Sequence, residues 1–375
     1  MKIAYVLDDT LDSSDGVQQY ILTIGSWMES RGHDVHYIVG HTKRKDVRNI
    51  HSFSKQFRVK FNRNVVSVSL PASPRKIQTI LAKEHFDVLH VQMPYSPMLG
   101  SRVIALSPKQ TAIVGTFHTA PYSKFEKFAN RMLGYALKPT LKAFDEVMSV
   151  SAPAQELGKR AFHMNSQIVP NVVSIKSFES KNFNSNVTPK IVFVGRQVPR
   201  KGCQHLIHAL KILDDQNIDF KAVIIGKGPH EKKNKKLANT LKNPQKINFL
   251  GFVSEERKRK TLNSADLAVY PSTGGESFGI VLIEAMAAGA GVVLAGNNAG
   301  YRSVMEPMPQ TLFDPRNHSG LADLLKFYLQ DKKHALEVGA AQKELVMQYD
   351  VERVGHKIEE IYKAAVAKKN NTEHN

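Results

Sequence analysis

Cysteine is almost absent from this chain of 375 residues, because Cys203 is the only one. A single cysteine excludes a disulfide framework and a cluster of cysteine metal ligands, and it fits a reducing compartment. The chain also lacks a run of about 18 uncharged apolar residues, which a membrane-spanning helix needs. Its first apolar run, Lys2 to Leu7, is followed by acids rather than by a small-residue cleavage site. We therefore expect a cytoplasmic protein.

Acidic residues are scarce relative to basic ones, with 34 Asp and Glu against 52 Lys and Arg, so the formal net charge is +18. Such a charge favours an anionic partner, such as nucleic acid, anionic lipid or a phosphorylated ligand. The window from Val35 to Lys83 holds eleven cations and one acid, Asp46, a net charge of +10. Phe53, Phe57 and Phe61 recur every four residues there, a mixture that suits a segment lying on an anionic membrane. No nucleic-acid-binding motif accompanies it.

Short β-branched runs alternate with longer helical patterns, which is typical of parallel strands joined by crossover helices. We predict an α/β protein with two Rossmann-like domains, residues 1–170 and 171–350, joined by a polar linker over 176–189. A C-terminal helix over about 351–367 and a disordered tail over 368–375 complete the chain. Parallel sheets bind ligands beyond the carboxyl ends of their strands, so the site is expected in a cleft between the two domains.

The predicted strands are 2–7, 35–39, 65–68, 88–91, 113–116, 146–149 and 168–169 in the first domain, and 190–194, 221–225, 247–250, 267–270 and 291–294 in the second. The predicted helices include 16–31, 74–84, 122–141, 152–161 and 280–288, with three more helical segments after Asn317.

The run from Gly274 to Gly289, GGESFGIVLIEAMAAG, passes from a loop into an apolar helix and carries Glu276 and Glu284. Unpaired N–H groups near Phe278 and Gly279, with the helix dipole behind them, are suited to a diphosphate. A carboxylate in the loop can accept hydrogen bonds from sugar hydroxyls, and one on the first turns of the helix can hold a ribose. Acids near a helix start also simply stabilise the dipole, but the glycines and the unbroken run favour the binding interpretation.

Two cations follow the first strand of the second domain. Arg196 lies at the end of the strand and Lys201 at the start of the next helix. Fixed cations there could neutralise a departing diphosphate, which is stabilisation at the place where charge develops. In isolation this motif favours an ordinary basic surface turn, and its combination with the glutamate run favours the binding interpretation.

Two turns of the first domain also lie at carboxyl ends of predicted strands. The run Gly115 to Thr119 ends a strand, and this position makes His118 a candidate for the site, although most single histidines are structural. Asp15-Gly16-Val17-Gln18 follows the first strand and opens a helix, which suggests a turn facing a phosphate or an acceptor. The histidine pairs at 33/36 and 205/208 have no supporting set of acid or cysteine ligands and are interpreted as surface residues.

The segments DGVQ, HVQMP, GTFHT, VGRQVPRKG, FLGFV, SADLAVYPS and GGESFGIVLIEAMAAG resemble, in order and spacing, the retaining GT-B glycosyltransferases of the large fourth sequence family. The resemblance is strongest to the bacterial phosphatidylinositol mannosyltransferases and runs over nearly the whole chain. It implies a GT-B fold whose C-terminal helix crosses back to the first domain. It also implies transfer of a hexose, mannose from GDP-mannose, to a lipid such as phosphatidylinositol, with retention of configuration.

The resemblance also implies roles for individual residues. The residues expected to act in catalysis are His118, Arg196, Lys201 and Glu276. The residues expected to bind the donor are Gly16, Val253, Lys258, Ser277, Phe278, Gly279, Ile280 and Glu284. For the acceptor and membrane surface, Gln18 is expected from the resemblance, and charge rather than motif adds Lys43, Arg44, Lys45, Arg58, Lys60, Arg63, Arg75 and Lys76. The family usually has two glycines where this chain has Asp15-Gly16, and a carboxylate there could repel a phosphate.

No two aspartates stand at positions i and i+2, so the D-x-D pair of metal-dependent sugar transferases is missing. We expect a metal-independent enzyme without a cofactor, whose co-substrate is a nucleotide sugar and which associates peripherally with the inner face of the cell membrane. Three alternatives remain: transfer of another hexose from UDP-glucose or UDP-N-acetylglucosamine, epimerisation of a nucleotide sugar, and nucleic-acid binding by a basic non-enzyme. The last leaves the glutamate and Arg/Lys motifs without a purpose.

Overall fold

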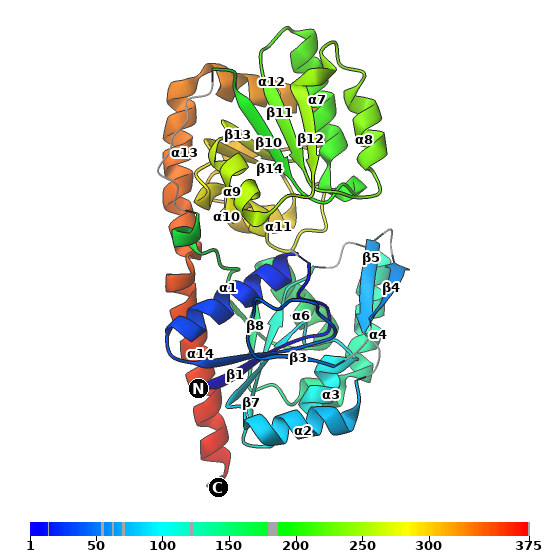
Figure 1. The fold of residues 1–375 in the computed structure, drawn as a ribbon, viewed down its shortest axis with the longest axis vertical. Helices are drawn as coiled ribbons and strands as arrows, with labels where there is room; N and C mark the ends of the chain where they lie inside the picture. The colour runs from blue at the N-terminus through cyan, green and yellow to red at the C-terminus, as the bar shows by residue number, and fades with distance from the viewer. Residues whose placement is uncertain are drawn as a thin grey trace. The chain divides into compact units, whose positions relative to one another are not determined.

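The computed structural model describes residues 1–13, 15–53, 56–61, 64–69, 72–120, 123–178 and 187–373. For residues 56–61, 64–69, 124, 372 and 373 it describes the backbone alone. The chain forms two compact units (Figure 1). Unit 1 combines Met1–Val172 with Val351–Asn375, and unit 2 spans Val173–Asp350. The predicted domain boundary at 170/171 lies two residues before this division, and the predicted cleft between the domains stays a prediction.

Unit 1 is built on a parallel sheet. Its strands are β1 (Lys2–Leu7), β2 (Asp34–Val39), β3 (Ile50–Ser52), β6 (Val88–Gln92), β7 (Ala112–Phe117), β8 (Glu146–Ser149) and β9 (Gln167–Ile168). They lie in the order β3-β2-β1-β6-β7-β8-β9, and every neighbouring pair is parallel. A separate antiparallel hairpin joins β4 (Gln56–Phe61) to β5 (Asn64–Ser69).

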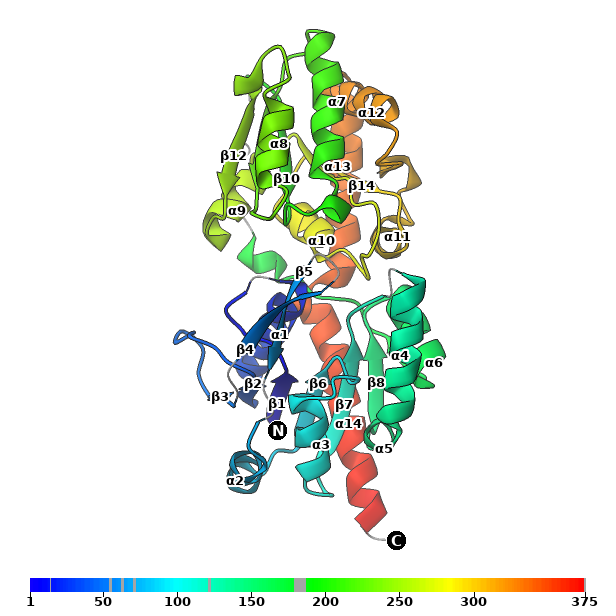
Figure 2. The ribbon, with the colours of Figure 1, turned by 90° about the vertical axis from the view of Figure 1, so that its right-hand side faces the viewer.

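Helices cover both faces of the unit 1 sheet. They are α1 (Gly16–Ser30), α2 (Pro74–Glu84), α3 (Leu99–Leu106), α4 (Lys124–Ala136), α5 (Lys138–Leu141), α6 (Ala152–Phe162) and α14 (Val351–Glu373). Successive side chains of a strand point to opposite faces, so Tyr5 joins one core cluster with α1 and α14 while Ala4 and Val6 join another with α2 and α3. The C-terminal helix α14 packs on α1 and β7 and is part of the unit 1 core (Figures 1 and 2).

Unit 2 repeats this architecture with its own sheet and helices. Its strands are β10 (Lys190–Val194), β11 (Lys221–Ile225), β12 (Ile247–Gly251), β13 (Leu267–Tyr270), β14 (Val292–Gly296) and β15 (Leu312–Phe313), in the parallel order β12-β11-β10-β13-β14-β15. Its α-helices are α7 (Cys203–Asp215), α8 (Glu231–Ala238), α9 (Glu255–Asn263), α10 (Ile280–Ala287), α11 (Ala299–Met305), α12 (His318–Gln330) and α13 (Lys332–Val346). Helices α7 and α12 lie side by side on the core formed by Ile191 and Phe193, whereas α13 packs on β14 and α10 (Figure 2).

The predicted α/β fold with two Rossmann-like domains is confirmed, but three local predictions are wrong. The strand at 65–68 is β5 of the antiparallel hairpin, not a strand of the parallel sheet. The helix at 122–141 is divided at Leu137, because Pro139 has no N–H to continue α4 and is tolerated only in the first turn of α5. The tail at 368–375 is helical as far as Glu373. Strands β3, β4 and β15 and helix α3 were not predicted. Residues 179–186 of the predicted linker lie outside the described residues.

Candidate functional site

The candidate donor site lies in unit 2 where the neighbouring strands β10 and β13 end. The chain leaves β10 toward β11 on one side, whereas β13 pairs with β10 on the other side. Such a reversal of strand order opens a crevice at the carboxyl ends of a parallel sheet. The loop after β10 and the loop after β13 therefore meet here, although their sequence motifs are about 75 residues apart.

Glu276 is the centre of a compact charged cluster. Its Oε2 lies 2.9 Å from Lys201 Nζ, and its Oε1 lies 3.0 Å from Arg200 Nη1 and accepts a hydrogen bond from Ser272 Oγ at 2.8 Å. The exposed fraction is 10% for the Glu276 side chain and 16% for that of Lys201. Burial alone would raise the pKa of Glu276, but Lys201 and Arg200 outweigh it and hold the pKa below its ordinary value. Glu276 is therefore a fixed anion at neutral pH.

The cations of this cluster differ in part from those that the sequence indicates. Lys201 contacts Glu276 as part of the short 3-10 turn Pro199–Lys201, just before α7 rather than on it. Arg196 lies two residues beyond β10, near enough to lower the pKa of Lys201, which burial lowers first and Glu276 raises. The second direct partner of Glu276 is Arg200, which the sequence did not single out. Its position next to Lys201 in a basic turn was the only signal available.

The loop after β13 enters α10 through Gly279, the N-cap residue, whose φ of +113° is rarely adopted by side-chain-bearing residues. A Cβ at this position would lie 2.6 Å from Cδ1 of Tyr301, so glycine is required for space as well. Phe278 is buried and packs edge-on against Tyr349 with ring centroids 5.5 Å apart. These contacts fix the start of α10, where Ile280 begins the helix and the first N–H groups precede the regular helical hydrogen bonds, although the N–H of Leu282 donates to the carbonyl of Gly279 at 2.9 Å. Ser277 completes the loop between Glu276 and this helix start.

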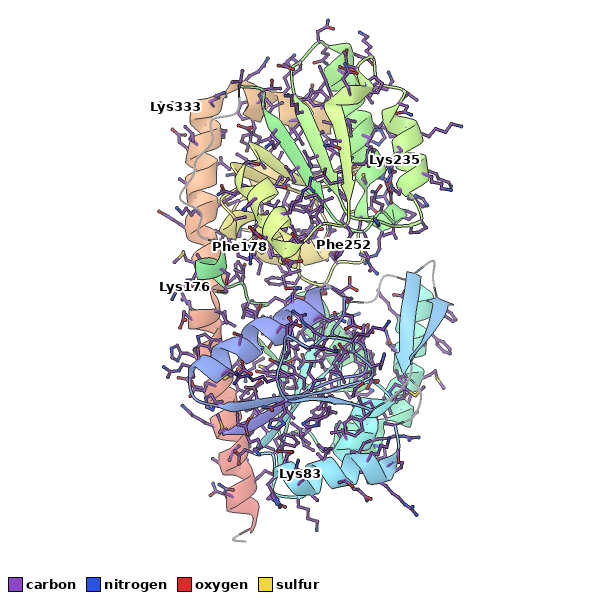
Figure 3. The ribbon with its side chains drawn as sticks, in the orientation of Figure 1. Lys83, Lys176, Phe178, Lys235, Phe252 and Lys333 are labelled. Carbon is purple, nitrogen blue, oxygen red and sulfur yellow. The ribbon has the colours of Figure 1, made fainter. Side chains whose placement is uncertain are left out.

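Glu284 is buried on α10 and pairs with Lys258 of α9. The Nζ of Lys258 lies 3.2 Å and 3.3 Å from the two carboxylate oxygens of Glu284, and 2.7 Å from Glu255. Burial raises the pKa of Glu284 despite Lys258, and the two glutamates raise the pKa of Lys258 against the effect of burial. The resemblance implies donor binding for both Lys258 and Glu284, and the structure joins them in one ion pair. Val253, half-buried between β12 and α9, follows the exposed Phe252 (Figure 3).

Tyr270 adds a polar atom that the sequence did not indicate. Its side chain is buried at the end of β13, and its hydroxyl has no hydrogen-bond partner among the residues that the structure describes. Burial, followed by the nearby Glu284, raises the pKa of this hydroxyl well above its usual value. An unsatisfied buried hydroxyl costs about 1–3 kcal/mol, so a ligand hydroxyl or phosphate at this position would relieve a penalty that the fold carries.

His118 of unit 1 lies directly after β7 and is buried. Its Nε2 lies 2.7 Å from Oε1 of Gln92, at the end of the neighbouring strand β6, and its ring meets the edge of Tyr20. Burial lowers the pKa of His118 to about 3. The ring is therefore neutral at physiological pH, so it can orient a hydroxyl group but does not supply a charged acid. Gln92, its partner, lies within the HVQMP segment but was not assigned a role from the sequence.

The turn after β1 places Gly16 at the start of α1, with Asp15 as the N-cap residue. Gln18 is buried, and its Nε2 donates a hydrogen bond to the carbonyl of Thr10 at 3.0 Å. Its Oε1 is buried without a hydrogen-bond partner within the described part of the chain. Gln18 thus offers an acceptor atom at the carboxyl end of β1, next to the strand β6 that leads to Gln92.

The basic window of unit 1 is only partly described. The exposed cations among its described side chains are Lys43, Lys45, Arg48, Arg75, Lys76 and Lys83, the last near the end of α2 (Figure 3). The half-buried Arg44 pairs with Asp46 at 2.8 Å. Arg63 and the side chains of Arg58 and Lys60 lie outside what the structure describes. The four-residue spacing of phenylalanines is not helical, because β4 is an extended strand in which Val59 pairs with Val66 of β5.

The interpretation of His36 as a surface residue is wrong. His36 is 5% exposed, its Nδ1 lies 2.9 Å from Nε2 of His51, and its Nε2 lies 3.2 Å from Asp34 and 3.9 Å from Glu84. One ligand atom each from His36, His51 and Glu84 lie within 4.8 Å of one another, a spacing that could hold a metal ion. Glu84 is, however, already paired with Lys2 at 3.1 Å, so hydrogen bonds and ion pairs account for this cluster.

Both halves of the chain match known protein families. Residues 14–177 match the model of Glycosyltransferase Family 4, and residues 175–345 match that of Glycosyl transferases group 1. A glycosyltransferase from Rickettsia africae superposes with a TM-score of 0.75 at 18% identity, covering 97% of this chain and 99% of that one. Anabaena HepE in complex with UDP gives a TM-score of 0.77 at 16% identity, covering 97% and 100%. The chain belongs to the glycosyltransferases of the GT-B type.

Within this class, the chain is similar to proteins named phosphatidyl-myo-inositol mannosyltransferase. That of Mycolicibacterium smegmatis is 29% identical over 370 residues, covering 96% of this chain and 93% of the relative. That of Propionibacterium freudenreichii is 29% identical over 314 residues, covering 80% and 78%. In the described part of the chain, every helix is too short or too polar to span a bilayer.

Proposed function

We propose that the protein transfers mannose from GDP-mannose to a lipid acceptor such as phosphatidylinositol, with retention of configuration and without a metal ion. The observation that carries this proposal is the buried Glu276 carboxylate, held by Lys201 and Arg200 where β10 and β13 end. Relatives named phosphatidyl-myo-inositol mannosyltransferase, similar over 96% of the chain, support the choice of sugar and acceptor.

The donor half of the proposed reaction uses the groups of unit 2. The ionised Glu276 accepts hydrogen bonds from hydroxyls of the transferred sugar. Lys201, with Arg196 and Arg200 beside it, stabilises the negative charge that develops on the diphosphate as it departs. The first N–H groups of α10 bind the same diphosphate. Glu284 has lone pairs left for the ribose hydroxyls after Lys258 has bound it.

The bond change needs no protein nucleophile. The hydroxyl of the acceptor attacks the anomeric carbon on the face from which the diphosphate leaves, the bond from that carbon to the diphosphate oxygen breaks, and the acceptor proton passes to a diphosphate oxygen. Because burial keeps His118 neutral, its proposed role is to orient a sugar hydroxyl by hydrogen bonding.

The acceptor half is assigned to unit 1 and to the inner surface of the cell membrane. Gly16 and Gln18 lie at the carboxyl end of β1, where the Oε1 of Gln18 lacks a partner among described groups. The exposed Arg75 and Lys76 stand in the first turn of α2. Cations in such positions attract anionic lipid headgroups, by about 1 kcal/mol each near the surface.

A donor and acceptor screen tests this proposal. The protein is incubated with labelled GDP-mannose, UDP-glucose or UDP-N-acetylglucosamine, with and without phosphatidylinositol vesicles and in the presence of EDTA, and label is followed into the organic phase. Transfer from GDP-mannose alone, dependent on the lipid and insensitive to EDTA, is expected. The matched control is Glu276→Gln, which keeps the shape of the side chain and removes its charge. Transfer from a UDP sugar would favour the alternative donor, and no turnover of any donor would refute the enzymatic proposal.

A further inference from the structure

Helix α4 of unit 1 presents its apolar residues to solvent. Phe125, Phe128, Met132 and Tyr135 are spaced three, four and three residues apart, so they form one stripe along the helix. Their exposed fractions are 65%, 63%, 55% and 67%. A surface helix ordinarily turns such a stripe toward the core. Helix α4 turns its apolar stripe toward solvent instead.

The packing of α4 fixes this orientation. The face that packs against α6 contains Gly134, whose position would bring a Cβ within 2.1 Å of the carbonyl oxygen of Ala161. Asn130 and Leu133 are half-buried on the same side, and Figure 2 shows α4 next to α6 at the flank of the unit. Rolling the helix to bury the stripe would break the close approach of Gly134 to Ala161. The apolar stripe is therefore a stable surface feature.

Positive charge surrounds the stripe. The exposed cations with described side chains on α4, on α5 and at the end of α5 are Lys127, Arg131, Lys138 and Lys142. None of them has a carboxylate partner among the described side chains. The only acid between residues 123 and 142 is Glu126, which is half-buried and follows the capping Ser123. A purely apolar partner would leave these cations unexplained, whereas an anionic one complements them.

A cavity of about 780 Å³ adjoins one end of the stripe. Tyr135, Lys138 and Lys142 contribute to its lining, and so do Asp145 and Glu146. These two acids pair with Lys369 and Lys368 of α14. The charge of the acids is thus balanced from another element, and the two lysines of the lining remain available to an anionic group.

We propose that the outward face of α4, formed by Phe125, Phe128, Met132 and Tyr135, docks unit 1 onto an anionic lipid bilayer. The aromatic rings enter the boundary between headgroups and acyl chains, and Lys127 and Arg131 contact lipid phosphates. An exposed apolar stripe beside unpaired cations is the pattern of an interfacial membrane helix. The inference deepens the proposed function, on which it rests for the lipid acceptor, and adds a surface outside the basic window of residues 35–83.

Vesicle flotation of the full chain tests this surface. Wild type, Phe125→Ser/Phe128→Ser and Lys127→Glu/Arg131→Glu are compared on phosphatidylglycerol–phosphatidylcholine vesicles and on pure phosphatidylcholine vesicles. The matched control is Leu336→Ser/Met347→Ser, which removes two side chains of unit 2 that are 75% and 52% exposed. Loss of the two phenylalanines is expected to weaken partitioning to the anionic vesicles about tenfold or more. The charge reversal should weaken binding to anionic vesicles only, and the control should bind like wild type.

The outcomes separate this inference from the proposed function. Equal flotation of wild type and Phe125→Ser/Phe128→Ser would overturn it. So would a sedimentation experiment in which wild type is a dimer, the variant is a monomer and flotation is unchanged, because the stripe would then bind a second copy of the chain. Lipid-free hydrolysis of GDP-mannose, measured on all variants, should be unaffected by the α4 changes. If no donor is turned over while flotation still depends on α4, the docking surface stands and the proposed transfer fails.

Discussion

Replacement of Lys201 by methionine probes the ion cluster at the ends of β10 and β13. The change keeps most of the side-chain volume and removes one of the two cations that contact Glu276. Breaking a buried pair by removing one partner typically costs about 3–5 kcal/mol. Arg200 and Ser272 remain at 3.0 Å and 2.8 Å from Glu276, so we expect the lower cost of about 2 kcal/mol. For a unit of this size, that loss lowers the Tm by about 4–8 °C.

The effect on activity should be larger than the effect on stability. If Lys201 stabilises the departing diphosphate, its loss removes charge stabilisation that acts in the transition state, and kcat should fall by about 10²–10³. If Lys201 serves only to neutralise Glu276, Lys201→Met should lower activity only because the Glu276 carboxylate is no longer held in place. The two roles make different predictions for a second substitution.

A double-mutant cycle of Lys201→Met and Glu276→Gln separates these roles. The double variant removes the charges of Lys201 and Glu276 together and leaves only Arg200, whose side chain is 23% exposed, without its carboxylate, so it should recover part of the lost thermal stability. Its kcat should nevertheless be lower than that of either single variant, since each residue is proposed to contact a different part of the donor. Thermal denaturation and initial rates with GDP-mannose measure both quantities. A double variant as active as Glu276→Gln alone would refute the proposal that Lys201 contacts the diphosphate.

Three further outcomes are expected. Lys258→Met leaves Glu284 buried without its cation, so calorimetry should show affinity for GDP weakened by about tenfold to a hundredfold, and unchanged affinity would remove the pair from the site. Gly279→Ala forces a positive φ on a side-chain-bearing residue and should destabilise unit 2 by about 1–3 kcal/mol with loss of GDP binding, which denaturation and titration can check. His90 is buried on β6, where its ring nitrogens contact Tyr362 and Thr116. Burial lowers the pKa of His90 and of His118 to about 3, so the stability that they contribute is present above about pH 6.5 and is lost as the pH falls toward 3. Urea unfolding should show the free energy of unfolding decrease as the pH falls between these values. His90→Gln should make this decrease smaller, and an unchanged decrease would contradict the lowered pKa of His90.

The donor residues could be found from the sequence because they lie within short continuous motifs. The glycines indicate a turn that leads into an apolar helix, which predicts where α10 starts. The fixed offset of Glu284 from that start then places it on the first turns of the helix. The direct partners could not be found in this way. Arg200 meets Glu276 because parallel strands bring together two loops whose contacting residues are 76 apart in sequence. Lys258 meets Glu284, 26 residues further along the chain, because α9 packs beside α10. Pairing across a sheet is a tertiary property that periodicity does not encode.

The errors in unit 1 have a different physical origin. Alternating and β-branched residues identify β5 as a strand, but they do not distinguish a hairpin strand from one in the parallel sheet. Composition likewise indicates that the tail is polar, whereas α14 continues to Glu373. The stripe on α4 was missed for the same reason. Amphipathicity predicts a helix with an apolar face, and only the contact at Gly134 determines that this face points outward.

The two glutamates of the run from Gly274 to Gly289 show how environment, rather than residue type, distinguishes their roles. Glu276 contacts two cations and a hydroxyl, and its pKa is held below the ordinary value despite burial. Glu284 has one cation, Lys258, which it shares with Glu255, and burial raises its pKa. The charge of Glu276 is therefore required to balance Lys201 and Arg200 at all physiological pH values. Glu284 can bind a ribose hydroxyl with less dependence on its charge, because a protonated carboxyl group also forms hydrogen bonds. The charged contact with the donor thus depends on Glu276, which is why the proposal of sugar transfer rests on that residue and not on the glutamate pair.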